Sequence, residues 1–285
     1  MRSERLMRVL VFPAFAPIAM LTAILLAVAL PGRTAQAQED QHDTIDTDRP
    51  SFAESPRTVG GGRFQVEAGI DFERNNGGGA REKTWSAPLL LRYGTGQRFE
   101  LRLETEGPIY RRSRATGDQP ADRASGFADV SLGVKWRMRS AVEQPSIWPS
   151  SALLVHVDLP TGTGRFEGES LRPSFRLPME WALSQALTLS FMPGIRYDKS
   201  RDEGRFVAPL FALGLSRDWS DHWRSFVELA APQLAASRFG GNQTSFNIGA
   251  AYLPRRNLQL DAAAFIGATR HTPDFTGTVG VSARW

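Results

Sequence analysis

The chain has 285 residues, with 34 lysines and arginines against 30 aspartates and glutamates, and it contains no cysteine. The lack of cysteine excludes a disulfide framework and a thiolate metal site. Residues 1–37 carry four arginines and one glutamate, so their removal leaves 30 basic and 29 acidic side chains. A nucleic-acid partner needs a clustered basic excess and is therefore not expected.

The first 37 residues have the organisation of a secretory signal peptide. Three arginines and one glutamate lie in residues 1–8, residues 9–30 are almost wholly apolar, and the small residues ending at Ala37 fit the cleavage rule. An apolar stretch of this length could also span a bilayer, which takes about 20 residues. Two prolines in the stretch and the cleavage site favour the signal peptide. We therefore expect the mature chain to begin near Gln38.

Residues 38–62 are polar and contain several turn formers, among them Pro50, Pro56 and three consecutive glycines at residues 60–62. This composition predicts an extended segment without regular structure. We expect residues 38–62 to lie in the periplasm or to plug the lumen of the domain that follows, which spans residues 63–285.

From residue 63 onwards the chain repeats short segments in which apolar and polar side chains alternate. Period two is the pattern of a β-strand with one apolar and one polar face. The last segment shows it without exception, since every second residue from Phe275 to Trp285 is apolar or glycine. A mean hydropathy of -0.28 fits this pattern, because alternation averages to a polar value while one face stays apolar.

About twelve such segments of roughly ten residues follow one another, an even count as in single-chain bacterial barrels. Long polar links, such as residues 74–83 and 110–125, alternate with mostly shorter links, such as residues 94–97. The sequence thus predicts an all-β fold, a transmembrane antiparallel β-barrel of the outer-membrane type. Long links would face outwards, and both termini would lie in the periplasm.

The chain ends on Trp285, which is in phase with the apolar face of the last strand. This ending resembles the terminal assembly signal of bacterial outer-membrane barrels. We therefore expect the barrel-assembly machinery and outer-membrane lipid to be partners of this chain.

Several short motifs, in this order and spacing, resemble one known family. They include Thr47-Asp48-Arg49-Pro50, Gly126-Phe127-Ala128-Asp129, Leu159-Pro160-Thr161-Gly162 and Asn257-Leu258-Gln259-Leu260-Asp261. Over essentially the whole mature chain they are similar to the outer-membrane transporters grouped with the meta pathway of phenol degradation. The resemblance implies an outer-membrane location and a transport role, and it supplies no catalytic or ligand residues.

Charged side chains occupy many positions on the inner face of the predicted strands. They could line a permeation path, or they could neutralise one another and stiffen a narrow barrel. Arginine predominates, and its forked head suits bridging between strands, which favours a narrow or plugged pore. The candidates for lining the lumen are Arg92, Arg98, Glu100, Arg102, Glu104, Lys135, Arg137, Arg172, Arg176, Glu180, Arg196 and Arg284.

Catalytic signals are weak. His156 and Asp158 share one face and could bind a metal, but without a third ligand nearby a hydrogen-bonded pair is favoured. A lipid- or peptide-cleaving barrel would need a histidine at its rim, and His271 near Asp274 is the only plausible base. We therefore expect no catalytic residues, no metal and no cofactor.

The sequence favours a passive outer-membrane channel for small, aromatic solutes. Two alternatives stay open: a non-transporting envelope barrel whose outer loops serve binding or protection, and an outer-membrane lipid or peptide hydrolase.

Overall fold

The computed structural model describes residues 44–77, 80–115, 121–140, 147–200 and 202–285. The predicted signal peptide, its cleavage position and the first residues of the segment 38–62 lie outside the described residues. Within the described ranges no helix is long and apolar enough to cross a membrane. Regular structure there is β-strand, apart from the short 3-10 turns η1 (Gly164–Phe166) and η2 (Ser237–Phe239).

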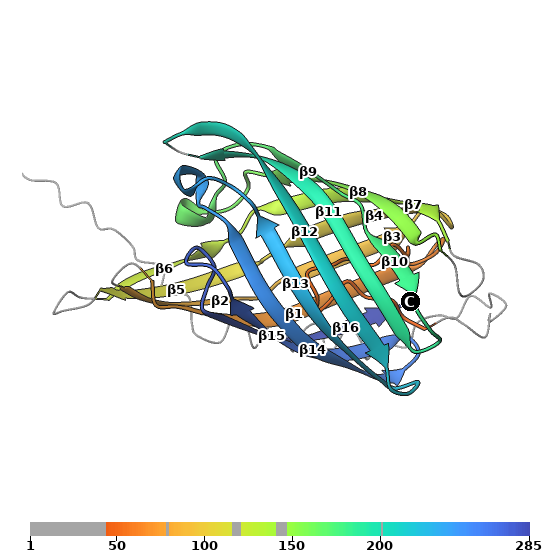
Figure 1. Ribbon diagram of the computed structural model, residues 1–285. Helices are drawn as coiled ribbons and strands as arrows, with labels where there is room; N and C mark the ends of the chain where they lie inside the picture. Colours follow the sequence, from red (N-terminus) through yellow and green to blue (C-terminus); the bar gives the residue numbers. More distant parts are fainter. Residues whose placement is uncertain (1–43, 78–79, 116–120, 141–146, 201) are drawn as a thin grey trace, which may run out of the picture. The chain divides into compact units, whose positions relative to one another are not determined.

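The described part of the chain forms sixteen strand segments in one antiparallel sheet (Figure 1). In chain order they are β1 (Phe64–Asn75), β2 (Ala80–Ser86), β3 (Leu89–Gly94), β4 (Phe99–Thr105), β5 (Pro108–Ala115), β6 (Asp122–Phe127), β7 (Val130–Arg139), β8 (Ser150–Leu159), β9 (Arg172–Arg176), β10 (Met179–Ala182), β11 (Leu187–Ser200), β12 (Gly204–Asp218), β13 (Trp223–Gln233), β14 (Gln243–Arg255), β15 (Leu258–Gly267) and β16 (Phe275–Arg284).

Eight of these segments combine into four interrupted strands. The members of each pair, β2 with β3, β4 with β5, β6 with β7 and β9 with β10, follow one another between the same neighbouring strands. Counted in this way, twelve strands form the wall. The wall closes because β1 pairs with β16, from Gln65 opposite Arg284 to Arg74 opposite Phe275. The predicted antiparallel barrel of about twelve strands is confirmed.

The interruptions have local causes. Pro88 separates β2 from β3 and Pro178 separates β9 from β10, and a proline has no N–H group to give to the ladder. Gly107, between β4 and β5, has a φ of 66°, which glycine adopts without strain. Its carbonyl accepts a hydrogen bond of 2.9 Å from the N–H of Ala128, which lies in the break between β6 and β7. The breaks in these two adjacent strands therefore lie side by side.

Apolar and polar residues lie on opposite faces of the wall, as period two predicts. Leu101, Val134 and Val279 are between 41% and 56% exposed on the outer face, whereas their neighbours Glu100 and Lys135 are fully buried on the inner face. A lipid-facing exterior around a polar interior is the arrangement of a membrane barrel.

Aromatic side chains collect at the end of the barrel that carries the short turns. Phe64 and Trp285 exchange backbone hydrogen bonds of 3.1 and 2.9 Å, and their ring centroids lie 6.3 Å apart. Phe99 and Trp136 stack at the same distance on neighbouring strands. Such a row is typical of the interface between lipid and water.

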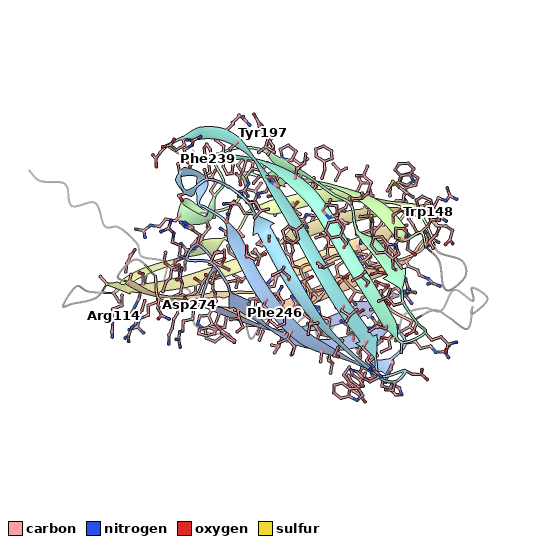
Figure 2. The ribbon with its side chains drawn as sticks, viewed as in Figure 1. Arg114, Trp148, Tyr197, Phe239, Phe246 and Asp274 are labelled. Atoms are coloured by element: carbon pink, nitrogen blue, oxygen red, sulfur yellow. The ribbon has the colours of Figure 1, made fainter. Side chains whose placement is uncertain are left out.

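The opposite end differs from the prediction in one respect. Parts of the links predicted at residues 74–83 and 110–125 are strand, because β1, β2, β5 and β6 extend into them. Polar side chains occupy both faces of these extensions, so period two gives no contrast in hydropathy there. Figure 2 places Arg114 near the outer end of β5.

Candidate channel lumen

The N-terminal segment, residues 44–62, lies against inward-facing side chains of the wall, and Asp48 is its most connected residue. One Asp48 carboxylate oxygen is 2.6 Å from Nη1 of Arg102 and 3.1 Å from Nζ of Lys135. The other accepts the N–H of Ser55 at 2.8 Å. Burial alone would raise the pKa of Asp48, but the positive charges of Arg92, Lys135 and Arg102 hold that pKa well below its usual range. Asp48 is therefore an anion that neutralises the cations around it.

Two carboxylates of the wall bind backbone N–H groups of the segment. Glu67 on β1 accepts the N–H groups of Asp48 and Arg49, each at 3.0 Å. Glu100 on β4 accepts the N–H of Val59 at 2.9 Å. Arg92 lies between the two carboxylates, 2.9 Å from Glu67 and 2.8 Å from Glu100. The fully buried wall charges thus satisfy one another and also replace the backbone partners that an irregular segment lacks.

Arg49 occupies a recess in the wall formed by two glycines. Its Nη2 atom donates to Thr278 Oγ1 at 2.5 Å and to Asp261 Oδ1 at 3.3 Å. Gly69 on β1 and Gly280 on β16 are register partners beneath it. A Cβ atom on either glycine would lie 2.4 Å from a guanidinium nitrogen of Arg49. The recess therefore fits an arginine only because both wall residues are glycine.

The second half of the segment is held on another part of the wall. Glu54 forms ion pairs with Arg102 and Arg176. Glu228 on β13 accepts the N–H groups of Phe52 and Ala53 at 2.9 and 2.7 Å.

Apolar contacts on the same side of the lumen add to this anchoring. Ala53 packs in a cluster with Met192, Leu210 and Ala212 of β11 and β12. Residues 44–62 thus contact inner positions on strands from several sides of the barrel.

Two cavities lie on either side of the segment. The larger, of about 520 Å³, is lined by acidic, basic and apolar side chains, among them Glu106, Arg196 and Phe265. The smaller, of about 170 Å³, lies among residues of β10 to β15. Residues 49–51 and Glu54 line both cavities. The N-terminal segment therefore divides the interior of the barrel.

A family model that matches this chain covers most of the N-terminal segment and the whole wall. A profile of the family described as the MetA-pathway of phenol degradation matches residues 47–285. The chain belongs to this family. The match begins at Thr47, the first residue of the motif that carries Asp48 and Arg49, so these anchoring residues lie within the family region.

One solved outer-membrane channel has the same fold as this family member. An outer membrane channel from Pseudomonas putida F1 has a TM-score of 0.59 at 13% identity, over 80% of this chain and 97% of that one. The β domain of the Bordetella autotransporter BrkA has a TM-score of 0.49 at 12% identity, over 78% and 99% of the two chains. The CymD monoaromatic hydrocarbon channel has a TM-score of 0.41 at 8% identity, over 79% and 89%. A search of curated protein sequences finds no match.

Most residues predicted to line the lumen of this family member lie at inner positions. Arg92, Glu100, Arg102 and Lys135 surround the segment, and Glu104, Arg172, Arg176 and Arg196 line the larger cavity, while Glu180 lines the smaller one. Arg284 is buried near the closure of the wall, and Arg137 is half-buried on β7.

Arg98 is the exception among these candidates, because it is exposed in the turn between β3 and β4. The strand begins one residue later, at Phe99, so the predicted strand is too long at this end.

Glu54, Glu67 and Asp261 belong to the site and were not among the sequence candidates. Glu67 and Asp261 stand on the inner face of β1 and β15, and an isolated acid on a predicted inner face is the signal that would have found them. Glu54 belongs to the segment, where no periodicity marks a face.

His156 is not positioned for a catalytic relay. Nδ1 of His156 lies 3.2 Å from Ser131 Oγ and 3.4 Å from Glu104 Oε2, while its Nε2 is buried without a partner. A relay needs the nucleophile and the orienting carboxylate on different ring nitrogens, and here both approach the same one. Among the described residues no three acidic or histidine side chains are grouped to hold a metal ion.

Proposed function

We propose that the protein is a passive channel of the bacterial outer membrane for small aromatic compounds, and that residues 44–62 close its lumen in the described state. The observation that carries the proposal is the division of the interior into two cavities by a segment held through buried ion pairs. A solute then crosses the barrel only when residues 44–62 move out of the lumen.

The solute class follows from the family and from the larger cavity. A volume of about 520 Å³ falls in the range of small-molecule sites. Phe52, Phe265 and Pro88 offer apolar faces to a single ring, while charged residues beside them suit a hydroxyl or carboxylate. A phenol or an aromatic acid combines these two characters.

The chain offers a clean test of closure because it contains no cysteine. The variant Ala53→Cys/Ala212→Cys places one thiol on the segment and one on the wall, within a single buried cluster. Uptake of labelled benzoate, an aromatic acid whose anion crosses lipid slowly, is measured in proteoliposomes for the oxidised and reduced variant, with crosslinking verified by mass spectrometry. We expect oxidation to stop uptake and reduction to restore it, whereas each single-cysteine variant should respond to neither treatment.

A barrel lacking residues 38–60 separates this proposal from its first alternative. It should pass phenol and conduct ions in planar bilayers faster than the full mature chain. If the truncated and full-length barrels both insert and neither passes any solute, the protein is a non-transporting envelope barrel. Lipid or peptide cleavage that is lost in His271→Ala would support a hydrolase instead.

A further inference from the structure

A row of four cations crosses the outer face of the barrel wall at the end opposite the C-terminus. Arg74 on β1 is the register partner of Lys83 on β2, Lys83 is the partner of Arg112 on β5, and Arg112 is the partner of Arg123 on β6. All four side chains are exposed. A second pair, Arg81 opposite Arg114, lies one step further out on β2 and β5.

The row lies on the same face as the lipid-facing side chains. Phe72 on β1, Trp85 on β2 and Tyr110 on β5 form the neighbouring row on this face, two strand positions closer to the middle of the barrel. The rings of Phe72 and Trp85 lie 4.6 Å apart. Aromatic belts mark the interface between lipid and water. Two residues of strand span about 7 Å. The cations therefore lie about one headgroup layer outside the apolar region.

The acidic side chains of these strands lie on the opposite face, which also carries Arg111. Glu73, Glu82 and Asp122 occupy the alternate positions, where Glu82 pairs with Arg111 and Asp122 with Arg165. In the described part of the chain, none of the four cations in the row forms an ion pair. Like charges opposite one another on adjacent strands destabilise a sheet. An anion from outside the chain would remove this repulsion.

We propose that this row binds the phosphate groups of a phosphorylated glycolipid in the outer leaflet of the outer membrane. Arginine guanidinium groups match phosphate oxygens in two-point geometry, and the aromatic row beneath provides a surface for the acyl chains. The position at headgroup depth favours a membrane lipid over a soluble anion. The inference rests on the proposed outer-membrane location but not on the transport of any solute.

The test uses the full mature protein in nonionic detergent, titrated with purified lipopolysaccharide that carries lipid A phosphates. The variant replaces Arg74, Lys83, Arg112 and Arg123 by glutamine. Its matched control replaces four exposed cations at the other end of the barrel, Arg98, Arg217, Arg255 and Arg256, by glutamine. We expect the row variant to bind at least tenfold more weakly than the wild type, and the control to bind as the wild type does. Dephosphorylated glycolipid should bind poorly to the row variant and to the control.

Thermal unfolding gives a second measurement that remains informative if affinity is hard to determine. Without glycolipid, the row variant should unfold at a higher temperature than the wild type because the repulsion is gone. With glycolipid, the order should reverse. The double variant Arg112→Gln/Arg123→Gln should show the same reversal in smaller measure if the fourfold variant assembles poorly.

Equal affinity of the row variant and the wild type would overturn the proposal, and so would equal binding of phosphorylated and dephosphorylated glycolipid. Tight binding of inorganic phosphate alone would assign the row to a soluble anion and also overturn it. Uptake of labelled benzoate by the same proteins reconstituted into vesicles keeps the two proposals apart, because the row variant should retain full uptake.

Discussion

Gly69 and Gly280 face each other across the seam that closes the barrel, and together they leave the space that the guanidinium of Arg49 fills. The seam joins the first and last strands of the chain, so the segment is attached where the wall is completed. Arg49 also reaches Thr278 on β16, one of the two strands of this seam, and Asp261 on the adjacent strand β15.

The glycine recess can be tested with a single methyl group. Gly69→Ala should displace Arg49 from Thr278 and Asp261, because a Cβ would lie 2.4 Å from its nitrogen. Hydrogen bonds to charged groups contribute about 1.5–3 kcal/mol each. Loss of one would therefore shift the equilibrium between the closed and open states towards the open state by roughly tenfold or more. We expect a matching rise in planar-bilayer conductance. Gly96→Ala, where a Cβ meets open space, should leave conductance unchanged.

The buried charge cluster makes a prediction about stability. Asp48→Asn removes the anion shared by Arg102 and Lys135 and leaves buried cations without a partner. Breaking a buried ion pair by removing one partner costs about 3–5 kcal/mol. We expect a lower unfolding temperature and a segment that proteases cleave. Adding Lys135→Gln to Asp48→Asn should recover part of the loss, and no recovery would show that the two residues are not coupled.

The two faces of the wall should respond differently to charge. Leu132→Arg, four residues along β7 from the rim side chain of Trp136, places a cation against lipid and should destabilise the barrel by about 2–4 kcal/mol near the midplane. Thr188→Arg, on an inner position that lines the smaller cavity, should be mild. Denaturant unfolding in lipid vesicles measures both. Similar losses would contradict the assignment of faces.

Period two identifies the faces of nearly every strand because burial alternates with the side-chain direction. It does not reveal what an inner residue contacts. By the pattern alone Glu67 is an ordinary lumenal position where arginine should be tolerated, yet the structure shows it accepting N–H groups of Asp48 and Arg49 and pairing with Arg92. These contacts join an irregular segment to the wall, and no local periodicity encodes them. The segment's motif could be recognised from the sequence, but its binding site could not.

Trp285 should matter for assembly beyond its own packing. Its backbone exchanges two hydrogen bonds with Phe64, and we infer that the assembly machinery reads it as part of the last strand. Deletion of Trp285 should leave unassembled protein in the periplasm, seen as loss of the heat-modifiable gel shift. Trp219→Ala, which removes an exposed rim tryptophan in a turn, is the control and should assemble. Full insertion without Trp285 would rule out the signal.

Ion selectivity should depend on the arginines only once the segment is gone. With the segment inside the barrel, Arg176 forms an ion pair with Glu54. Arg172 forms ion pairs with Asp129 and Asp158. Neither arginine then adds net charge to the cavity. Removing residues 38–60 takes Glu54 away and leaves Arg176 as an uncompensated cation in a low-dielectric passage, where it should favour anions.

The variant Arg176→Glu in this truncated barrel changes the local charge by two units and should move the reversal potential towards cation selectivity. Uptake of anionic aromatic acids should fall, while uptake of phenol, which is neutral, should be nearly unchanged. Arg114→Glu makes the same charge change at an exposed position on the outer end of β5 and should have little effect. A reversal potential that does not distinguish the two variants would mean that ions do not pass Arg176, and that the conducting path runs elsewhere in the barrel.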